Sequence, residues 1–251
     1  MVRAAAPILE IFSGIQGEGI LVGTRQVFVR FCGCNRRCFY CDTEGALGPV
    51  RTCAIERAPG SREFAQRENP LAVRDVVKAV VLLDAPRGLH DSVSLTGGEP
   101  LIHGEFLAAL CPRLTKKGLR VYLETNGTLP EALERILGEV WHVAMDVKLR
   151  SASGQPTPWE AHGRFLALAL GRSMQVKVVV CAETTEEELG RLAELVAGQE
   201  AAIPVVLQPV TPVRGVGAPT AEQVLRFQEF LKARLRDVRV IPQVHRLMGQ
   251  R

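Results

Sequence analysis

Long hydrophobic runs are missing from this sequence. No stretch of about 18 apolar residues occurs, and the first residues lack the charged-then-apolar pattern of a secretory signal. These absences argue against a membrane-spanning or exported chain, so we expect a cytoplasmic protein without a membrane partner. A strong charge imbalance is missing too, because the net charge is only +4 over 251 residues. So mild a charge does not indicate a nucleic-acid-binding protein, and we expect no nucleic-acid partner.

A second, separated pair of cysteines of the kind found in structural zinc sites is missing. Cys34, Cys38 and Cys41 follow the spacing Cys-x3-Cys-x2-Cys in one short segment. A closed structural zinc site needs four ligands, usually as two separated pairs. A [4Fe–4S] cluster held by three thiolates instead keeps one iron open for a small molecule. Because the cytoplasm keeps thiols reduced, the pattern favours an iron–sulfur cluster over zinc or a disulfide.

The other four cysteines receive no metal-binding role. Cys32 comes two residues before Cys34, where a spare ligand is one interpretation. We expect it instead to pack at the end of a strand, since free cysteine is commonly buried. Cys53, Cys111 and Cys181 stand at isolated positions and are assigned no function.

Strand and helix patterns alternate along most of the chain. The predicted strands are residues 26–31, 92–95, 119–124, 142–147, 175–180, 204–208 and 238–241. The predicted helices are residues 71–83, 105–116, 130–137, 159–170, 184–197 and 221–235. Repeated strand-then-helix units with short connections imply a parallel sheet covered by helices. About six strands precede the terminal one, fewer than the eight of a closed barrel.

The expected fold is therefore α/β: an incomplete (β/α)6-type partial TIM barrel with an N-terminal cluster-binding loop. We expect residues 1–251 to form a single domain. Residues 44–70 differ in character, because Gly, Pro, Arg and Glu dominate there and no regular period is sustained. This segment is predicted to be an insertion or flexible excursion that contributes little to the core.

Glycine and polar residues follow several of the predicted strands. The turn Thr96-Gly97-Gly98-Glu99-Pro100 comes directly after one of them. Its two glycines would let a ligand approach the backbone closely, and Glu99 offers a carboxylate to an ammonium group. An ordinary strand-to-helix turn fits the same residues when they are taken alone. The carboxyl ends of parallel strands are, however, where α/β barrels build their active sites.

Taken together, the three-cysteine loop, the Gly97-Gly98-Glu99-Pro100 turn and the incomplete barrel resemble the radical S-adenosylmethionine (SAM) superfamily. The resemblance covers roughly residues 26–208. It implies that the amine and carboxylate of SAM chelate the open iron of the cluster. Transfer of one electron then yields a 5′-deoxyadenosyl radical.

Further motifs are similar to one family, the 7-carboxy-7-deazaguanine synthases. These motifs are residues 11–19 (IFSGIQGEG), 28–30 (FVR), 33–43 (GCNRRCFYCDT), 124–127 (ETNG), 146–148 (DVK) and 241–245 (IPQVH). The resemblance implies a radical lyase that converts 6-carboxy-5,6,7,8-tetrahydropterin to 7-carboxy-7-deazaguanine with loss of ammonia. This reaction belongs to queuosine and deazapurine biosynthesis. The resemblance also implies Mg²⁺ dependence, a homodimer, and an electron donor such as a flavodoxin or ferredoxin.

The same resemblance assigns residues to the SAM site. Because the cofactor carries the radical, no side chain is predicted to be catalytic by itself. Gly97, Gly98 and Glu99 are expected around the SAM amine. The further candidates, near the carboxylate, ribose and adenine of SAM, are Asn126, Lys148, Ser151, Ser153 and Gln208, with Gln208 at the adenine end. For Lys148, a salt bridge with Asp146 or Glu124 is the structural alternative.

The predicted pterin site includes Gln16, Gly17, Glu18, Arg30 and His245. Gln16 and Glu18 lie in a glycine-flanked loop, where they can read the pyrimidine edge of a pterin with paired hydrogen bonds. Arg30 lies in an apolar strand, where an unpaired guanidinium would be costly, so it should face a carboxylate. That carboxylate is either the substrate's own or part of a structural salt bridge. His245 is similar to a family position that lines the substrate pocket.

Thr43 follows the last cysteine of the group by two residues. By resemblance to the family, its hydroxyl oxygen is expected to bind Mg²⁺, an ion that prefers oxygen ligands and keeps several waters. Without the resemblance, Thr43 would be interpreted as a loop or capping residue.

Two alternatives to this function stay open at the level of sequence. A glycyl-radical-enzyme activase shares the cysteine spacing, but it would need neither the Gln16-Gly17-Glu18 loop nor Arg30. A non-catalytic iron–sulfur or zinc protein would need only the cysteines.

Overall fold

A ten-stranded sheet organises the chain in the computed structural model, which describes residues 4–48 and 50–250. Its strand order is β12-β11-β10-β9-β8-β7-β3-β2-β4-β5. The strands are β2 Ile8–Ile15, β3 Arg25–Phe31, β4 Thr52–Glu56, β5 Phe64–Glu68, β7 Ser92–Gly97, β8 Val121–Thr125, β9 Val140–Val147, β10 Ser173–Val180, β11 Val205–Pro209 and β12 Val238–Val240. Two short strands, β1 Ala5–Ala6 and β6 Leu71–Ala72, pair separately. All neighbours from β3 to β12 are parallel.

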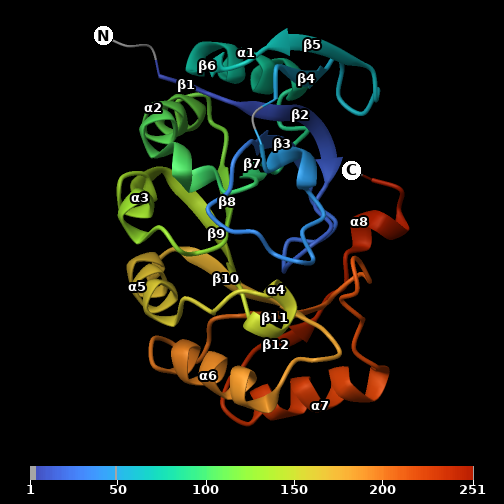
Figure 1. Cartoon of the computed structure of the whole chain (residues 1–251). Coiled ribbons are helices and arrows are strands. Elements are labelled where there is room, and N and C mark those ends of the chain that lie inside the picture. Colours follow the sequence, from blue (N-terminus) through green and yellow to red (C-terminus); the bar gives the residue numbers. More distant parts are fainter. Residues whose placement is uncertain (1–3, 49, 251) are drawn as a thin grey trace.

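Helices follow most strands of the sheet. They are α1 Val73–Leu83, α2 Gly104–Thr115, α3 Pro130–Glu134, α4 Arg150–Ser153, α5 Trp159–Ala169, α6 Glu186–Ala197, α7 Ala221–Lys232 and α8 Val244–Leu247. In Figure 1, α2, α3 and α5 lie on one side of the strands, and the long loop after β3 lies on the other. Among the described residues, no helix is long and apolar enough to cross a membrane.

The central strands have an apolar face and a polar face. Successive side chains of a strand point to opposite faces. Leu95 and Leu123 therefore join the main hydrophobic core, whereas their neighbours Ser94 and Glu124 meet on the other face, where the Ser94 hydroxyl donates to Glu124 Oε1 at 3.2 Å. The loop after β3 covers this polar face, which makes it the place for a binding site.

The predicted fold class is confirmed. Six parallel strands, β3 and β7 to β11, precede the terminal strand β12, and the observed strands agree with the predicted ranges to within a few residues. The sequence interpretation missed β2, which pairs antiparallel with β3. This strand carries the loop of Gln16 and Glu18 on its carboxyl end.

Residues 44–70 are more regular than the sequence predicted. β4 and β5 form an antiparallel pair, and β4 also joins β2 in parallel, so the segment extends the sheet. Cys53 is fully buried, and Glu56 Oε2 accepts a hydrogen bond from Ser13 N at 2.8 Å. The expectation of a flexible segment with little core is therefore wrong for these two strands. The pattern misled because β5 is an edge strand whose last three residues are all exposed. That the segment is an insertion, and that the chain is a single domain, stay predictions.

Candidate active site

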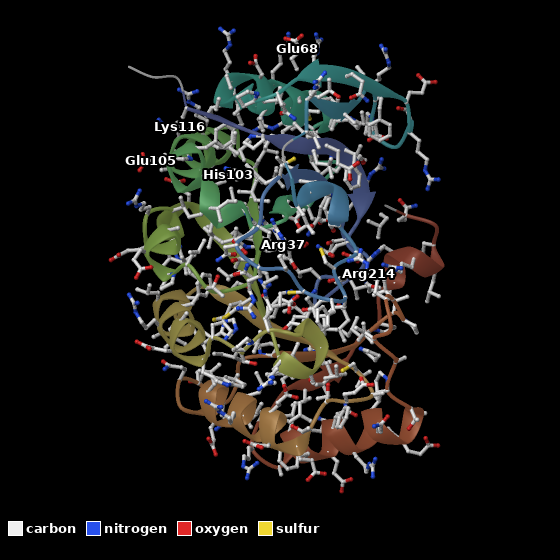
Figure 2. All side chains as sticks on the ribbon, in the orientation of Figure 1. Arg37, Glu68, His103, Glu105, Lys116 and Arg214 are labelled. Carbon is white, nitrogen blue, oxygen red and sulfur yellow. The ribbon has the colours of Figure 1, made fainter. Side chains whose placement is uncertain are left out.

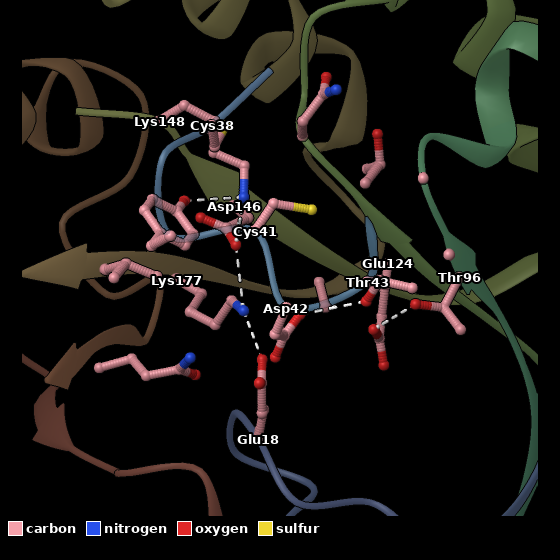
Figure 3. A pocket seen from close by; sticks show the side chains of 18 of the residues that line it. Glu18, Cys38, Cys41, Asp42, Thr43, Thr96, Glu124, Asp146, Lys148 and Lys177 are labelled. Atoms are coloured by element: carbon pink, nitrogen blue, oxygen red, sulfur yellow. Dashed lines mark hydrogen bonds and ion pairs between the residues drawn. The ribbon is translucent and has the colours of Figure 1, made fainter. Parts of the chain in front are cut away.

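A cavity lies between the loop after β3 and the polar face of the sheet. Cys34, Cys38 and Cys41 line it from the loop side. Figure 3 shows Cys38 and Cys41. From the sheet side it is lined by Thr96, Tyr122, Glu124, Ala144, Asp146, Gln175, Lys177, Val179 and Gln208. These residues alternate with core residues along β7 to β11, which is why the strands place them all on one face.

The three cysteines predicted to bind a cluster come together. Cys34, Cys38 and Cys41 are free thiols and all line the cavity. Cys32 is buried, as expected of a packing residue, and it does not line this cavity. In the described part of the chain the cavity thus offers three thiols without a fourth, which fits a [4Fe–4S] cluster with one open iron.

The cysteine loop is attached to the turns that follow β7 and β8. Gly33 N donates to Ala46 O at 2.6 Å, which closes the loop on itself. Asn126 Nδ2, after β8, donates to Asn35 Oδ1 at 2.8 Å, within the loop. Glu99 N, after β7, donates to Gly33 O at 2.8 Å. These hydrogen bonds hold the loop against the turns that follow β7 and β8.

Gly97 and Gly98 both lie at the cavity, as predicted, and neither tolerates a side chain. Gly97 has φ +119°, a backbone conformation that L side chains rarely adopt. A Cβ at Gly98 would lie 2.0 Å from the carbonyl oxygen of Gly33. The close approach of these two backbones holds the cysteine loop against the sheet.

We expect Gly98→Ala to displace the cysteine loop. The added Cβ meets a backbone atom, which cannot rotate away, so the cost should reach about 2–4 kcal/mol of unfolding free energy. Urea denaturation measures it. Gly138→Ala is the matched control, because a Cβ there has no heavy atom within 4 Å. Equal stability of the two variants would contradict this role of Gly98.

Glu99 was expected near the amine of SAM, at the first cavity. Its carboxylate is fully buried and does not line the cavity. Oε1 accepts from Leu101 N at 3.0 Å and from Thr125 Oγ1 at 2.8 Å, and Oε2 accepts from Asn126 N at 2.7 Å. Glu99 thus joins the turns after β7 and β8, and its contact with the SAM amine stays a prediction. The donors around this carboxylate all come from the chain itself, and two of them, Thr125 and Asn126, lie far from Glu99 in sequence. Sequence spacing alone therefore does not reveal the arrangement.

Ionisation of Glu99 is expected to oppose folding of the cluster-free protein. Burial raises the pKa of Glu99 to about 7, although hydrogen bonds from Asn126, Leu101 and Thr125 lower it in part. The folded chain then holds this proton more tightly than the unfolded chain, so the contribution is lost as pH rises from about 4.5 to 7. Between pH 5 and pH 8, wild type should lose about 3 kcal/mol of unfolding free energy relative to Glu99→Gln. Parallel pH dependence in both proteins would refute this.

Of the other SAM-site candidates, Asn126, Lys148 and Gln208 line the cavity. Lys148 Nζ donates to Asp146 Oδ2 at 2.8 Å, so the structural alternative of a salt bridge is present. Gln208 is 3% exposed, and its Oε1 has no hydrogen-bond partner among the described residues. A buried acceptor of this kind calls for a donor from a ligand.

Ser151 and Ser153 do not line this cavity. Ser151 Oγ contacts Thr184 Oγ1 at 3.2 Å, and Ser153 is fully buried with Oγ donating to Gln155 O at 3.2 Å. That they bind SAM stays a prediction. Both serines belong to the short helix α4, which follows β9.

A second cavity adjoins the first and collects the predicted pterin residues. Gln16, Gly17, Glu18, Arg30 and His245 all line it. Gln16 Nε2 donates to Glu124 Oε1 at 2.7 Å and to Gln26 Oε1 at 3.1 Å, which fixes the orientation of its amide.

Arg30 faces both cavities from β3. Its Nε donates to Glu10 Oε1 at 2.9 Å, so the structural salt bridge considered at sequence level exists. Because one nitrogen is used in this way, the guanidinium plane is held in a fixed orientation.

The C-terminal segment closes over the loop of Gln16 and Glu18. Val244 N donates to Gly17 O at 2.9 Å, and a Cβ at Gly17 would lie 2.2 Å from His245 Nδ1. Gln243 Nε2 donates to Glu18 Oε1 and to Asp42 Oδ2, each at 2.8 Å. The tail motif thus completes the second cavity.

A group of ligand atoms suited to a cation lies where the cavities meet. Oxygens of Glu18 and Asp42 and a ring nitrogen of His245 all lie within 4.8 Å of one another. Thr43, predicted to bind Mg²⁺, lines both cavities, and its Oγ1 donates to Asp42 Oδ1 at 3.1 Å. Oxygen-rich donors of this kind fit Mg²⁺.

Sequence reasoning gave no role to several residues of the site. Lys177 Nζ contacts Glu18 Oε2 and lies 3.0 Å from Asp146 Oδ2. Glu124 Oε2 accepts from Thr96 Oγ1 at 2.7 Å. The signal that would have found them is a polar residue at every second position of an otherwise apolar strand.

The chain is similar to proteins of known family and known structure. Residues 28–152 match the Radical SAM superfamily. The chain is 42% identical over 252 residues to 7-carboxy-7-deazaguanine synthase of Geobacter sulfurreducens, with 100% of both sequences covered. It is 33% identical over 270 residues to the protein of the same name from Methanothermobacter thermautotrophicus, again with 100% of both covered. The crystal structure of QueE from Escherichia coli shares the fold, with a TM-score of 0.63, 23% identity, and 96% and 95% of the two chains covered.

Proposed function

The chain belongs to the 7-carboxy-7-deazaguanine synthase family of the radical SAM superfamily, and from this membership we propose its reaction and the residues that serve it. It is a radical SAM enzyme and a carbon–nitrogen lyase of queuosine biosynthesis. We propose that its substrate is 6-carboxy-5,6,7,8-tetrahydropterin, which loses ammonia as its ring contracts. Full-length relatives of this kind leave the glycyl-radical-enzyme activase and the non-catalytic alternatives without support.

The observation that carries this proposal is that the two cavities share a wall. Seven residues line both of them: Glu18, Arg30, Asp42, Thr43, Thr96, Glu124 and Arg246. A pterin in the second cavity would therefore lie against whatever occupies the first. When bound there, a [4Fe–4S] cluster with SAM supplies a 5′-deoxyadenosyl radical.

The chain's own residues would hold and orient these groups. Cys34, Cys38 and Cys41 would hold the cluster, and Gln208 Oε1 is a buried acceptor suited to a donor on the adenine of SAM. The C-terminal segment would exclude water from the pterin.

On the substrate side, charge and hydrogen bonding favour a pterin with a carboxylate. Burial raises the pKa of Glu18, but the Lys177 ammonium and the hydrogen bonds lower it by more, so the group is held below its usual range as a carboxylate. A carboxylate accepts from the N–H groups of a pyrimidine edge. Arg30, oriented by Glu10, would bind the substrate's carboxylate, and His245 would close the pocket. We further propose that Mg²⁺ binds beside Thr43.

Metal content tests the first requirement. Anaerobically reconstituted protein should carry about four irons per chain, the number in one cubane cluster. One zinc per chain and no iron would refute the proposal.

We also propose that the electron donor is a protein such as a flavodoxin or ferredoxin, docking over the cysteine loop. Arg37 is exposed on this loop and donates to Cys34 O at 3.2 Å, and Arg214 donates to Cys41 O at 3.5 Å (Figure 2). Cationic groups so close to the cysteines favour an acidic partner.

Arg37→Glu is expected to slow turnover driven by reduced flavodoxin by roughly tenfold at low salt, because the charge reversal weakens electrostatic steering. Turnover driven by dithionite should not change. Arg67→Glu, on the exposed edge strand β5, makes the same charge change elsewhere and should behave as wild type. A similar loss with both reductants would contradict docking at Arg37.

The homodimer and the cytoplasmic location stay predictions. Sedimentation of the purified protein tests the first of them.

A further inference from the structure

A row of alternating charges, Glu18, Lys177, Asp146 and Lys148, crosses the polar face of the sheet and ends at the neutral phenol of Tyr40; we call these five residues the charge ladder. Lys177 Nζ contacts Glu18 Oε2 and lies 3.0 Å from Asp146 Oδ2. Lys148 Nζ donates to the same Asp146 oxygen at 2.8 Å and to Tyr40 OH at 2.9 Å. Figure 3 shows Glu18, Lys177, Asp146 and Lys148 in succession across the cavity.

All five residues of the ladder line the first cavity, and Glu18 at one end lines the second cavity as well. Glu18 lines the second cavity, where the pterin is proposed to bind. Tyr40 lies in the cysteine loop, between Cys38 and Cys41. Lys177 and Asp146 connect these ends from the neighbouring strands β10 and β9. The ladder is thus a continuous line of contacts from one cavity to the cluster loop.

The carboxylate of Asp146, in the middle of the ladder, can accept a further hydrogen bond. Asp146 Oδ2 serves both ammonium groups, whereas Oδ1 is buried and has no hydrogen-bond partner among the described residues. An unused buried acceptor is costly, so a donor that moves onto it is stabilised. Burial lowers the pKa of Lys177, but Asp146 and Glu18 raise it by more, and the ammonium therefore stays charged.

We propose that Lys177 is a positioning residue that couples binding of the pterin to binding of SAM. The proposal rests on the function proposed above. When the N–H groups of a pterin occupy the oxygens of Glu18, Lys177 is released from Glu18 and moves onto Asp146 Oδ1. Asp146 then holds Lys148 less tightly, and the Lys148 ammonium turns to the carboxylate of SAM in the first cavity. The affinity for SAM is therefore higher when the pterin is bound than when it is absent.

Coupled binding of the two ligands distinguishes this proposal from a purely structural role of the ion pairs. Two carboxylates and two ammonium groups balance in charge, so ion pairing alone would only stabilise the fold. A structural role would change stability in a variant but would not make the affinity for one ligand depend on the other.

The test measures SAM binding with and without the pterin. Equilibrium dialysis of SAM against the reconstituted holoenzyme is carried out without a reductant, so that no turnover occurs. With saturating 6-carboxytetrahydropterin, the affinity of wild type for SAM should rise roughly fivefold or more. In Lys177→Gln this factor should fall to about one, and Lys177→Arg, which keeps the charge, should restore part of it. By linkage, SAM should change the affinity for the pterin by the same factor.

Matched variants keep the result decisive. Lys78→Gln, an exposed lysine of α1, should keep the full coupling factor. If Lys177→Gln does not fold, Asp146→Asn breaks the same link and should also be uncoupled. Independent binding of the two ligands to wild type, or full coupling in the folded variants, overturns this proposal but leaves the proposed function intact. Failure of wild type to bind the pterin at all overturns both.

Discussion

Cys38→Ala is expected to abolish cluster assembly and every step that depends on it. Two thiolates cannot hold a cubane cluster whose fourth iron must stay open, so the iron content should fall from about four per chain to a trace. Neither 5′-deoxyadenosine nor deazapurine should form above background. Iron analysis and chromatography of the reaction products measure the two effects.

The control for this variant is another cysteine of the same chain. Cys111 is fully buried in α2, away from the cavity, and Cys111→Ala should keep full iron content with only a modest loss of stability. Retention of four irons in Cys38→Ala would contradict the assignment of the cluster to the loop after β3.

Arg30→Ala is expected to reduce kcat/KM for the carboxytetrahydropterin by roughly 100-fold or more, because the carboxylate of the substrate then lacks the guanidinium proposed to bind it. Cleavage of SAM in the absence of pterin should be nearly unchanged, since Arg30 contacts none of the cysteines. Comparing product formation with 5′-deoxyadenosine formation separates the two steps. This split also distinguishes a small-molecule enzyme from one that acts on a protein backbone.

Loss of the Arg30–Glu10 salt bridge must be separated from loss of substrate binding. The two side chains are only 16% and 13% exposed, so removing Arg30 alone should cost roughly 3 kcal/mol of stability. In Arg30→Ala/Glu10→Gln the remaining charge is removed as well, and much of that stability should return. Activity that returned with stability would show that Arg30 is structural; activity that stays low supports substrate binding.

The sequence was sufficient for the barrel because its strands are regular. Residues 92–97 (SVSLTG) and 173–180 (SMQVKVVV) are short segments with an apolar residue at about every second position, the pattern of strands with one face in the core. The cluster loop was also predictable, since Cys34, Cys38 and Cys41 come from one short segment and need no tertiary contact to be recognised. All three indeed line one cavity.

Contacts between distant segments were beyond sequence reasoning. Lys177 and Glu18 lie 159 residues apart, and nothing in either local pattern indicates that they meet. Glu99 was expected at the ligand because its motif is adjacent to the cavity. Its rotamer instead directs the carboxylate to Asn126 N, and that choice depends on how the turns after β7 and β8 pack.

Edge strands were missed for a different physical reason. β4 and β5 lie at the end of the sheet, where half-exposed and exposed residues outnumber buried ones and the period of two is weak. Ser151 and Ser153 lie in a short helix, α4, that the sequence interpretation did not predict, and neither lines the cavity of the three cysteines.

Conversion of the pterin tests the central claim most directly. The reconstituted protein is incubated anaerobically with SAM, dithionite, Mg²⁺ and 6-carboxy-5,6,7,8-tetrahydropterin. The products are separated by chromatography and identified by mass spectrometry. The account predicts 7-carboxy-7-deazaguanine that depends on SAM and on reductant, and that disappears in Cys38→Ala. Protein that carries a full cluster and cleaves SAM but forms no deazapurine would contradict it.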